Sequence, residues 1–311
     1  MAITLDGSTV PLPREFSATL LKNSFEQSVI SPLTPSTPMR LGVDSVIPVY
    51  EGGIEAGFVG EGEAKPVSDA AMSFQTLKTR KVAAIVVVSK ELAQVNPAQL
   101  MTYVQQDMSN AITRALDLGI LYGVDAKSGA AIDGATSVNA TTNRVQISDG
   151  DLVPQLLAGY DLAAGEKSDP TGFTFDTRWR SKIALAAQQQ VTVPGAPAPM
   201  PNLATAADSV AGLPATYGRV VSGRVGTNPD TGVKGFIGDW SKLKWGYAEN
   251  ISVQRSTEAT IVDGGTTYHL FQQNMIALLV EAHVGWTITD ATAFAAYEGA
   301  AAGGDTGEVT P

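Results

Sequence analysis

The sequence predicts an α+β protein built around one long helix. Three patterns indicate this fold class: an uninterrupted apolar run over residues 82–88, an amphipathic helical pattern over residues 97–123, and apolar β-type runs between residues 251 and 288. Val and Ile dominate the run at 82–88, and unbroken β-branched runs are typical of strands buried on both faces. We therefore expect a buried strand that leads into a long helix.

The predicted helix has a start signal and a stop signal. Asn96 is a suitable N-cap, Pro97 suits the first helical position, and Gln99 stands where a capping box has Glu or Gln. Gly123 is a C-terminal stop signal, which makes the helix roughly 40 Å long. Apolar residues recur along it at steps of three or four, as on one buried helix face: Leu100, Val104, Met108, Ala111, Ala115, Leu118 and Tyr122.

The chain before this unit is expected to be extended. Residues 1–13 are polar, and residues 31–38 contain three prolines, which disfavour helix and sheet interiors. Between these segments, residues 13–25 have the pattern of a short amphipathic helix with Phe16 and Leu20 on its apolar side. The sequence therefore predicts an N-terminal arm over residues 1–45.

Residues 46–82 are predicted to form a long β-hairpin. Residues 46–50 have strand composition, residues 56–66 are glycine-rich and charged as in a loop tip, and residues 74–82 alternate and lead into the buried strand. An isolated two-stranded hairpin is marginally stable in water and exposes unpaired edges. We therefore expect this hairpin to lie on a neighbouring subunit, which is the first indication of assembly.

The middle of the chain predicts a second, compact α/β unit over about residues 136–245. Helices are expected at residues 148–164 and 177–190, and a proline-rich loop at residues 193–201. The expected short strands lie at residues 173–175, 217–225, 235–240 and 244–247.

The C-terminal part has the strongest β patterns. Strands are expected at residues 251–255, 268–281 and 277–288, and Asp263-Gly264-Gly265 is expected to form a turn between the first two. Residues 290–297 are expected to form a small terminal element. Residues 299–311 have few bulky apolar side chains and are expected to be a loose tail.

Composition excludes several classes of protein. The 311 residues contain no cysteine, which excludes disulfides, thiolate metal sites and thiol catalysis. No apolar run is long enough to span a membrane, and no secretion signal follows Met1. The net charge of -10 disfavours tight or sequence-specific DNA binding, although an acidic container can still enclose DNA.

No residue pattern indicates an active site. The two histidines, His269 and His283, lie in apolar β segments without partners at catalytic or metal-ligand spacing, which favours packing roles. The segment at residues 57–62 has the glycine content of a phosphate-binding loop but lacks the required Lys-Ser or Lys-Thr. No acidic residues have the spacing of paired catalytic carboxylates. We therefore predict no catalytic residues, no cofactor and no metal site.

Lys78, Arg80 and Lys81 form the densest basic cluster of the chain. One interpretation is a solvated strand face. The other is pairing with acidic groups of another subunit, such as Glu51, Glu55, Glu61 and Glu63. At an interface such pairs set register and orientation more than net affinity.

The order of these segments resembles the major capsid proteins of tailed bacteriophages with the Hong Kong 97-like fold, especially the short phage capsid family. The resemblance covers about residues 14–298 and rests on landmarks in the family's order: residues 47–62 with Phe74, residues 88–92, residues 116–123, Leu213-Pro214, Gly238-Asp239-Trp240, residues 277–286 and residues 290–294. It implies an N-terminal arm (1–45), an extension-loop β-hairpin (46–82), a peripheral domain with the long spine helix 97–123 (83–135 and 246–284), an axial α/β domain (136–245 and 285–298) and a flexible tail (299–311).

The resemblance implies a structural protein of the virion. Many copies would form pentamers and hexamers that close into an icosahedral shell around double-stranded DNA, assembled in the host bacterial cytoplasm as a procapsid that matures. The expected partners are other copies of the chain, a scaffolding protein, a portal protein and a decoration protein, without sequence-specific DNA binding and without a membrane. The expected inter-subunit contacts are Phe58, Glu61, Glu63, Lys65, Lys78, Arg80 and Lys81 in the extension loop and Asp263, Gly264 and Gly265 in a peripheral-domain turn.

Two features of some relatives are not expected here. The chain begins at Met1 without the long cleaved scaffolding region of those relatives, so we expect a separate scaffolding protein or none, and no processing. A covalent crosslink would join Lys65 to Asn250 or Asn274, but no buried acid or base marks these residues, so we expect no crosslink.

Two alternatives remain open at the level of the sequence. An encapsulin-type nanocompartment shares the fold that the resemblance implies but encloses cargo protein. A soluble hydrolase or lyase that uses His283 and Asp290 is the remote alternative.

Overall fold

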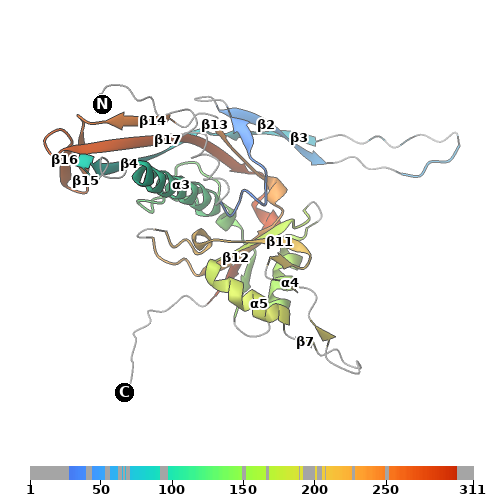
Figure 1. Ribbon diagram of the computed structural model, residues 1–311. Helices are drawn as coiled ribbons and strands as arrows, with labels where there is room; N and C mark the ends of the chain where they lie inside the picture. Colours follow the sequence, from blue (N-terminus) through green and yellow to red (C-terminus); the bar gives the residue numbers. More distant parts are fainter. Residues whose placement is uncertain are drawn as a thin grey trace, which may run out of the picture.

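The fold is described from a computed structural model of the chain (Figure 1). The described residues are 28–39, 44–52, 57–61, 65, 67, 71–91, 97–148, 152–165, 168–188, 190–191, 200–201, 205–206, 208–225, 228–248 and 252–299. The predicted arm up to residue 27, the cap at Asn96, most of the loop 193–201 and the tail beyond residue 299 lie outside them.

The first sheet is organised around its longest strand, β17 (Met275–Ile288). β4 (Arg80–Ser89), β14 (Ser252–Ser256) and β13 (Leu243–Ala248) each pair antiparallel with β17, and β1 (Thr37–Met39) adds to β13 in parallel. The predicted strands at 82–88 and 277–288 are thus confirmed and are direct neighbours. The predicted strand at 244–247 is also confirmed, and it lies in this first sheet.

The long helix α3 (Pro97–Tyr122) packs across one face of this sheet (Figure 1). Its residues Val104, Met108 and Ile112 form a buried cluster with Leu278 and Val280 of β17. The predicted helix is confirmed, and Val104, Met108 and Leu118 of its predicted stripe are buried, whereas Ala111, Ala115 and Tyr122 are half-exposed and the buried Ile112 and Leu116 were not in the stripe. Gly123 ends the helix as predicted, with a left-handed φ of 68° that L side chains adopt rarely.

Two details of the β predictions are wrong. Residues 268–281 are not one strand, because β16 (Thr266–His269) ends before a turn at residues 270–274 and Asn274 has a φ of 54°. The strand at 82–88 is not buried on both faces within one subunit, because α3 covers only one face of the sheet. Alternate side chains therefore face solvent, and Ile85 is 52% exposed.

The second sheet has seven strands in the order β5-β18-β12-β6-β11-β10-β9. One face packs against α4 (Leu152–Ala163) and α5 (Arg180–Gln188), so the two predicted helices in this region are confirmed. The strands are β5 (Arg144–Gln146), β6 (Gly172–Phe175), β9 (Thr205–Ala206), β10 (Ser209–Val210), β11 (Leu213–Tyr217), β12 (Val233–Gly238) and β18 (Phe294–Glu298).

The predicted strand at residues 217–225 is wrong. β11 ends at Tyr217, and the chain continues as the 3-10 turn η3 (Arg219–Ser222). Gly223 follows in the left-handed region with a φ of 73°, which turns the chain away from the sheet. The other 3-10 turns are η1 (Val138–Ala140), η2 (Thr177–Trp179), η4 (Trp240–Lys242) and η5 (Ala291–Ala293).

One hydrophobic core joins the two sheets. The other face of the second sheet, including Phe236 and Phe294, packs into the cluster that also contains Trp240, Trp245 and Trp286. The C-terminal half of α3 enters the same cluster. The two sheets are therefore held together by a continuous apolar contact rather than by a linker.

Three two-stranded hairpins extend from this body. β2 (Ser45–Gly52) pairs with β3 (Ala71–Leu77), β15 (Thr260–Asp263) with β16, and β7 (Gln190–Val191) with β8 (Met200–Pro201). The β2–β3 hairpin is the predicted one, and it projects far from the rest of the molecule (Figure 1).

Candidate inter-subunit surfaces

The β2–β3 hairpin exposes an apolar face. Cross-strand pairing places Val46 opposite Thr76 and Pro48 opposite Phe74, so these side chains lie on one side of the ribbon. On that side Val46 is 61% exposed, Met72 59% and Phe74 72%. Large apolar side chains that remain in water along one strand face mark a surface for a partner.

The base of the hairpin is fixed to the body. Leu77 is fully buried, and the backbone N–H of Thr79 donates to Asp44 Oδ1 at 3.0 Å. On the opposite side from Phe74, Gln75 Oε1 accepts a hydrogen bond of 3.1 Å from Thr287 Oγ1 of β17. The hairpin therefore leaves the body in a defined direction.

The tip of the hairpin carries several of the predicted contact residues. Phe58 is fully exposed, and Glu61 and Lys65 are exposed. Glu63 lies outside the described residues. A fully exposed phenylalanine in a glycine-rich loop has no packing role within the subunit, which is consistent with the predicted contact.

Two members of the predicted basic cluster already have partners within the subunit. The guanidinium of Arg80 donates to the carbonyl oxygens of Asp133 (3.3 Å) and Gly134 (2.8 Å) and lies 4.7 Å from the ring centroid of Trp286. Desolvation lowers the pKa of Arg80, and the nearby Asp133 and Asp44 oppose this effect. Lys81 forms an ion pair with Glu281 across the β4–β17 ladder.

Of this cluster, Lys78 has an exposed side chain. Its ammonium group lies near Gly134, where an added Cβ would be 3.2 Å from Lys78 Nζ. The contact of all three basic residues with another subunit stays a prediction. The partners of Arg80 and Lys81 within the subunit are residues 133, 134, 281 and 286. They are distant in sequence, so no local pattern connects them with residues 78–81.

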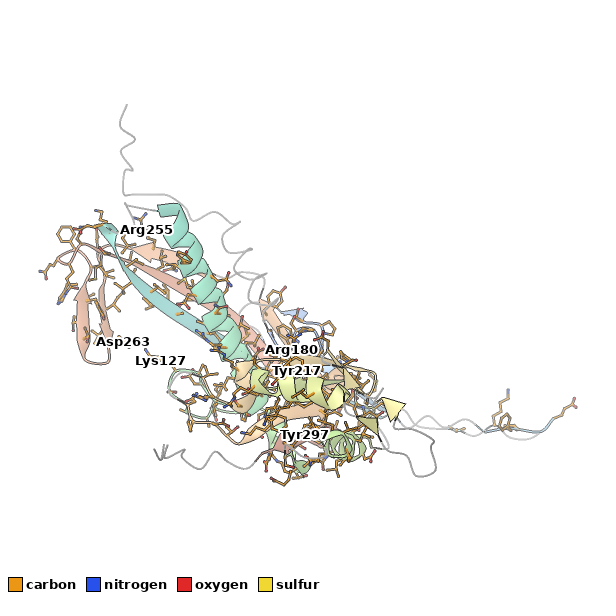
Figure 2. The ribbon with its side chains drawn as sticks, turned by 60° about the horizontal axis from the view of Figure 1, so that its bottom comes forward. Lys127, Arg180, Tyr217, Arg255, Asp263 and Tyr297 are labelled. Atoms are coloured by element: carbon orange, nitrogen blue, oxygen red, sulfur yellow. The ribbon has the colours of Figure 1, made fainter. Side chains whose placement is uncertain are left out.

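The predicted turn at Asp263, Gly264 and Gly265 is the tip of the β15–β16 hairpin. Gly264 and Gly265 have φ angles of 55° and 89°, and a Cβ added to either would meet open space. Asp263 Oδ1 accepts a hydrogen bond of 2.8 Å from Lys127 Nζ, and Figure 2 shows the two residues side by side. Phe271, which follows β16, is 80% exposed, so this end of the molecule also presents an apolar side chain to water.

The structure does not bring His283 and Asp290 together as a catalytic pair. His283 lies within β17, and Asp290 follows the end of that strand, so roughly 20 Å of extended chain separates them. The Asp290 carboxylate accepts hydrogen bonds from the backbone N–H (2.8 Å) and hydroxyl (2.6 Å) of Thr292, as a turn cap does. His269 lies beside Thr260 Oγ1, with 3.3 Å between that atom and Nδ1.

No group of three or more His, Cys, Asp or Glu among the described residues has the arrangement of a metal site. None of the described helices is both long and apolar enough to cross a membrane.

Asp117 lies within residues 116–123, where the sequence alone favours capping or solvation for an acidic side chain, and the structure shows that this expectation is wrong. It is buried in α3 and accepts hydrogen bonds from Ser28 Oγ (2.5 Å) and the backbone N–H of Val29 (3.0 Å). Burial raises its pKa to about 7, and the two hydrogen bonds oppose that increase. It therefore ties the start of the described chain to the long helix. A charged residue at a helix position next to apolar neighbours is the only sequence signal for this role.

Comparisons with known proteins agree on one family. A model of the Phage capsid family matches residues 8–299. The chain is 26% identical over 300 residues to the probable major capsid protein gp17 of Mycobacterium phage D29, which covers 90% of this chain and 87% of that protein. It is 25% identical over 290 residues to the major capsid protein of Staphylococcus phage 80alpha, with 91% and 83% covered.

Solved structures show the same relationship. The chain superposes on a chain of Gordonia phage Cozz with a TM-score of 0.69 and 29% identity, covering 88% of this chain and 87% of that one. For Mycobacterium phage Ogopogo the TM-score is 0.66 and the identity 25%, with 88% and 92% covered. A capsid of an empty GTA particle, at 14% identity and a TM-score of 0.56, shares the fold.

Proposed function

The chain belongs to the phage capsid family, and we infer from this that it is the major capsid protein of a tailed bacteriophage. It is a structural protein of the virion and not an enzyme. The main support for this conclusion is the family model, which matches residues 8–299, nearly the whole chain. The named relatives are phage capsid proteins, which favours a phage head over an encapsulin-type compartment.

We propose that copies of the chain form pentamers and hexamers that close into an icosahedral shell around double-stranded DNA. We also propose the Hong Kong 97-like division into an extension loop at 46–82, a peripheral domain that contains α3 and the first sheet, and an axial domain that contains the second sheet; the presence of two separate sheets supports it. The proposed bounds are residues 83–135 and 246–284 for the peripheral domain and residues 136–245 and 285–298 for the axial domain.

The exposed face of the β2–β3 hairpin is the proposed contact between copies. More than half of each of the side chains of Val46, Met72 and Phe74 is exposed in the described subunit, so this apolar area is available to a second copy. Burying apolar surface contributes about 25 cal/mol per Å². The same contact repeated around a ring therefore accumulates stability without any single strong site. A scaffolding protein, a portal protein and a decoration protein remain expected partners, and assembly in the bacterial cytoplasm remains the expected location.

A substitution that introduces a negative charge into this apolar face tests the proposed contact between copies. Phe74→Asp should leave the subunit folded but abolish closed shells, because a carboxylate would be desolvated at the contact. Phe74→Leu is the matched control and should keep the shells, since it preserves an apolar side chain. Negative-stain electron microscopy of the particles, with circular dichroism of the subunit, measures both properties. Normal shells from Phe74→Asp would contradict the proposed contact.

A further inference from the structure

The β2–β3 hairpin is joined to the first sheet by a short junction. The β2–β3 ladder reaches Leu77, and the β4–β17 ladder reaches Arg80. Lys78 and Thr79 between them belong to neither ladder. Such a segment has the form of a hinge, because no ladder fixes the angle across it. The other contacts of this junction therefore decide in which direction the hairpin points.

Arg80 is the first residue on the body side of the junction, and its guanidinium group binds two other segments. It donates to the carbonyl oxygens of Gly134 (2.8 Å) and Asp133 (3.3 Å) in the loop that follows α3, and to that of Lys78 in the junction itself (3.5 Å). The guanidinium group is planar and presents its donors in fixed directions, so these contacts set its orientation. Arg80 therefore ties the junction to the loop after α3.

The partners of Arg80 are themselves held in place. The ring centroid of Trp286 lies 4.7 Å from the guanidinium carbon of Arg80, and Trp286 Nε1 donates to the carbonyl oxygen of Thr136 at 2.9 Å. Gly119 of α3 packs closely on the same ring, since an added Cβ would lie 2.8 Å from it. The backbone N–H of Ile288 donates to Thr136 Oγ1 at 3.0 Å, which joins the loop to β17. The end of α3, the loop and β17 therefore form one packed seat for the guanidinium group.

Charge also draws both connections of the hairpin toward Arg80. Desolvation lowers the pKa of Arg80, and the carboxylates of Asp133 and Asp44 oppose this effect. Asp44 lies just before β2, and its Oδ1 accepts a hydrogen bond of 3.0 Å from the backbone N–H of Thr79. Asp44 thus links the chain that enters the hairpin with the chain that leaves it, and both lie beside the positive charge.

Two other contacts at the base of the hairpin are less directional. Leu77 is fully buried, and the burial of an apolar side chain favours no particular angle. Gln75 Oε1 accepts one neutral hydrogen bond of 3.1 Å from Thr287 Oγ1, and neutral hydrogen bonds are weaker than those with a charged donor. Arg80 combines charged hydrogen bonds, a ring contact and ionic attraction at one point.

We propose that Arg80 is the positioning residue of the hairpin, which sets the angle at which the hairpin leaves the first sheet and thus the angle at which it meets a second copy. This inference rests on the proposed function, in which the exposed hairpin face contacts another copy. The next residue, Lys81, has a different role, because it pairs with Glu281 across the β4–β17 ladder on the opposite face of β4.

The absence of cysteine from the chain allows the angle to be followed directly. Spin labels are attached through Met72→Cys, at an exposed position of β3, and Ser241→Cys, at an exposed position of η4 in the body. Double electron–electron resonance of the unassembled subunit then gives the distribution of distances between the labels. The native Arg80 should give one narrow distribution. Arg80→Gln, which removes the charge and the planar fork, should give a broader distribution with a shifted mean.

Lys81→Gln is the matched control, because it makes the same change of charge one residue further from the junction. It should keep the native distribution. An unchanged distribution in Arg80→Gln, or an equal broadening in Lys81→Gln or Gln75→Ala, would overturn the inference.

Arg80→Lys keeps the charge without the planar fork and should give a distribution of intermediate width. It replaces Arg80→Gln if circular dichroism shows that the latter does not fold. If both variants unfold, Arg80 is a residue of the folding core rather than a positioning residue, and the inference is overturned.

The angle of the hairpin should also control the particles. Arg80→Gln should form particles of irregular size and curvature, because a free hairpin lets neighbouring copies meet at several angles. Lys81→Gln should form shells as uniform as those of the native chain, and negative-stain electron microscopy measures this. Uniform shells from an Arg80→Gln protein with a broadened distance distribution would contradict the link between Arg80 and shell geometry.

The two proposals fail differently. If Phe74→Asp shells are normal, the hairpin contact of the proposed function is wrong, whatever the distances show. If Phe74→Asp blocks shells but Arg80→Gln keeps the native distance distribution, only the positioning role of Arg80 is wrong.

Discussion

Asp117 is a buried acidic residue at the contact between α3 and residues 28–31. Its carboxylate accepts two hydrogen bonds, and Ser28 Oγ also accepts from the backbone N–H groups of Ile30 (3.1 Å) and Ser31 (3.2 Å). Burial raises its pKa from 3.8 to about 7, so the folded state binds this proton more tightly than the unfolded state. The stability that protonated Asp117 contributes is therefore complete below about pH 4 and is lost as the pH rises through 7.

Asp117→Asn should remove this pH dependence. The amide keeps one oxygen that can accept a hydrogen bond from this site, and it carries no charge to bury. We expect the free energy of unfolding of the variant to exceed that of the native chain by about 1–3 kcal/mol at pH 8 and to converge with it near pH 4. Urea denaturation of the unassembled subunit between pH 4 and pH 8 measures this difference.

A control separates charge from hydrogen bonding. Asp117→Ala loses both hydrogen bonds and leaves the Val29 N–H without its acceptor, so it should be less stable than the native chain at pH 4 by about 1–3 kcal/mol. Asp125, Asp176 and Asp230 have lowered pKa values and give all three proteins the opposite trend at acid pH. The quantity to compare is therefore the difference in free energy of unfolding between the variants and the native chain at each pH. A difference between the native chain and Asp117→Asn that does not change with pH would contradict the assignment.

At the level of secondary-structure elements, the main contact is the packing of α3 on the first sheet. Val104 and Met108 of the apolar stripe that predicted the helix lie on β17, together with Ile112. Near the end of the helix, Gly119 allows the ring of Trp286 to approach closely, since an added Cβ would lie 2.8 Å from the ring atom Cη2. Trp286 cannot move away freely, because its Nε1 donates to the carbonyl oxygen of Thr136 at 2.9 Å and Arg80 lies over its ring.

Gly119→Ala should therefore destabilise the subunit. In a helix this change normally stabilises by nearly 1 kcal/mol, so the sign of the effect distinguishes close packing from intrinsic propensity. We expect a loss of about 1–3 kcal/mol, as for overpacked cores. Thermal or urea unfolding measures it, with Asn110→Ala on the half-exposed side of α3 as the control. A Gly119→Ala protein more stable than the native chain would contradict this prediction and show that the Trp286 ring can move to accommodate the added methyl group.

The described subunit exposes large apolar side chains on several elements. The hairpin exposes Phe74, the outer face of β4 exposes Ile85, and the β15–β16 end exposes Phe271. These side chains lie on different elements, so the proposed contacts between copies would be heterologous, as in rings of identical subunits. This distribution agrees with a capsid protein, in which stability is spread over many contacts between copies.

Shortening the hairpin tests whether it is needed for assembly but not for folding of the subunit. Removal of residues 52–70 should leave the free energy of unfolding of the subunit within about 1 kcal/mol, because the described tip residues are exposed and bury no core. The same variant should form no closed shells. Size-exclusion chromatography with light scattering measures assembly, and urea denaturation measures the subunit. An unfolded subunit would show that the hairpin is part of the core.

The sequence by itself determined the fold class, the long helix with its end at Gly123, the strands at 82–88 and 277–288 and the projecting hairpin. Each of these elements follows from the spacing of apolar residues or from a turn signal within a short segment, and such local patterns can be recognised in the sequence. It also indicated that no residue constellation has catalytic spacing, and the family comparisons agree that the protein is structural.

Which faces are covered and which charges are paired depends on contacts between distant segments of the chain. Arg80 and Lys81 find partners more than fifty residues away, and Asp117 holds a segment 88 residues before it. Ile85 belongs to a strong apolar run but is half exposed, because α3 covers only one face of its sheet. Such contacts depend on how distant segments pack, and a local pattern carries no information about the element that will lie opposite.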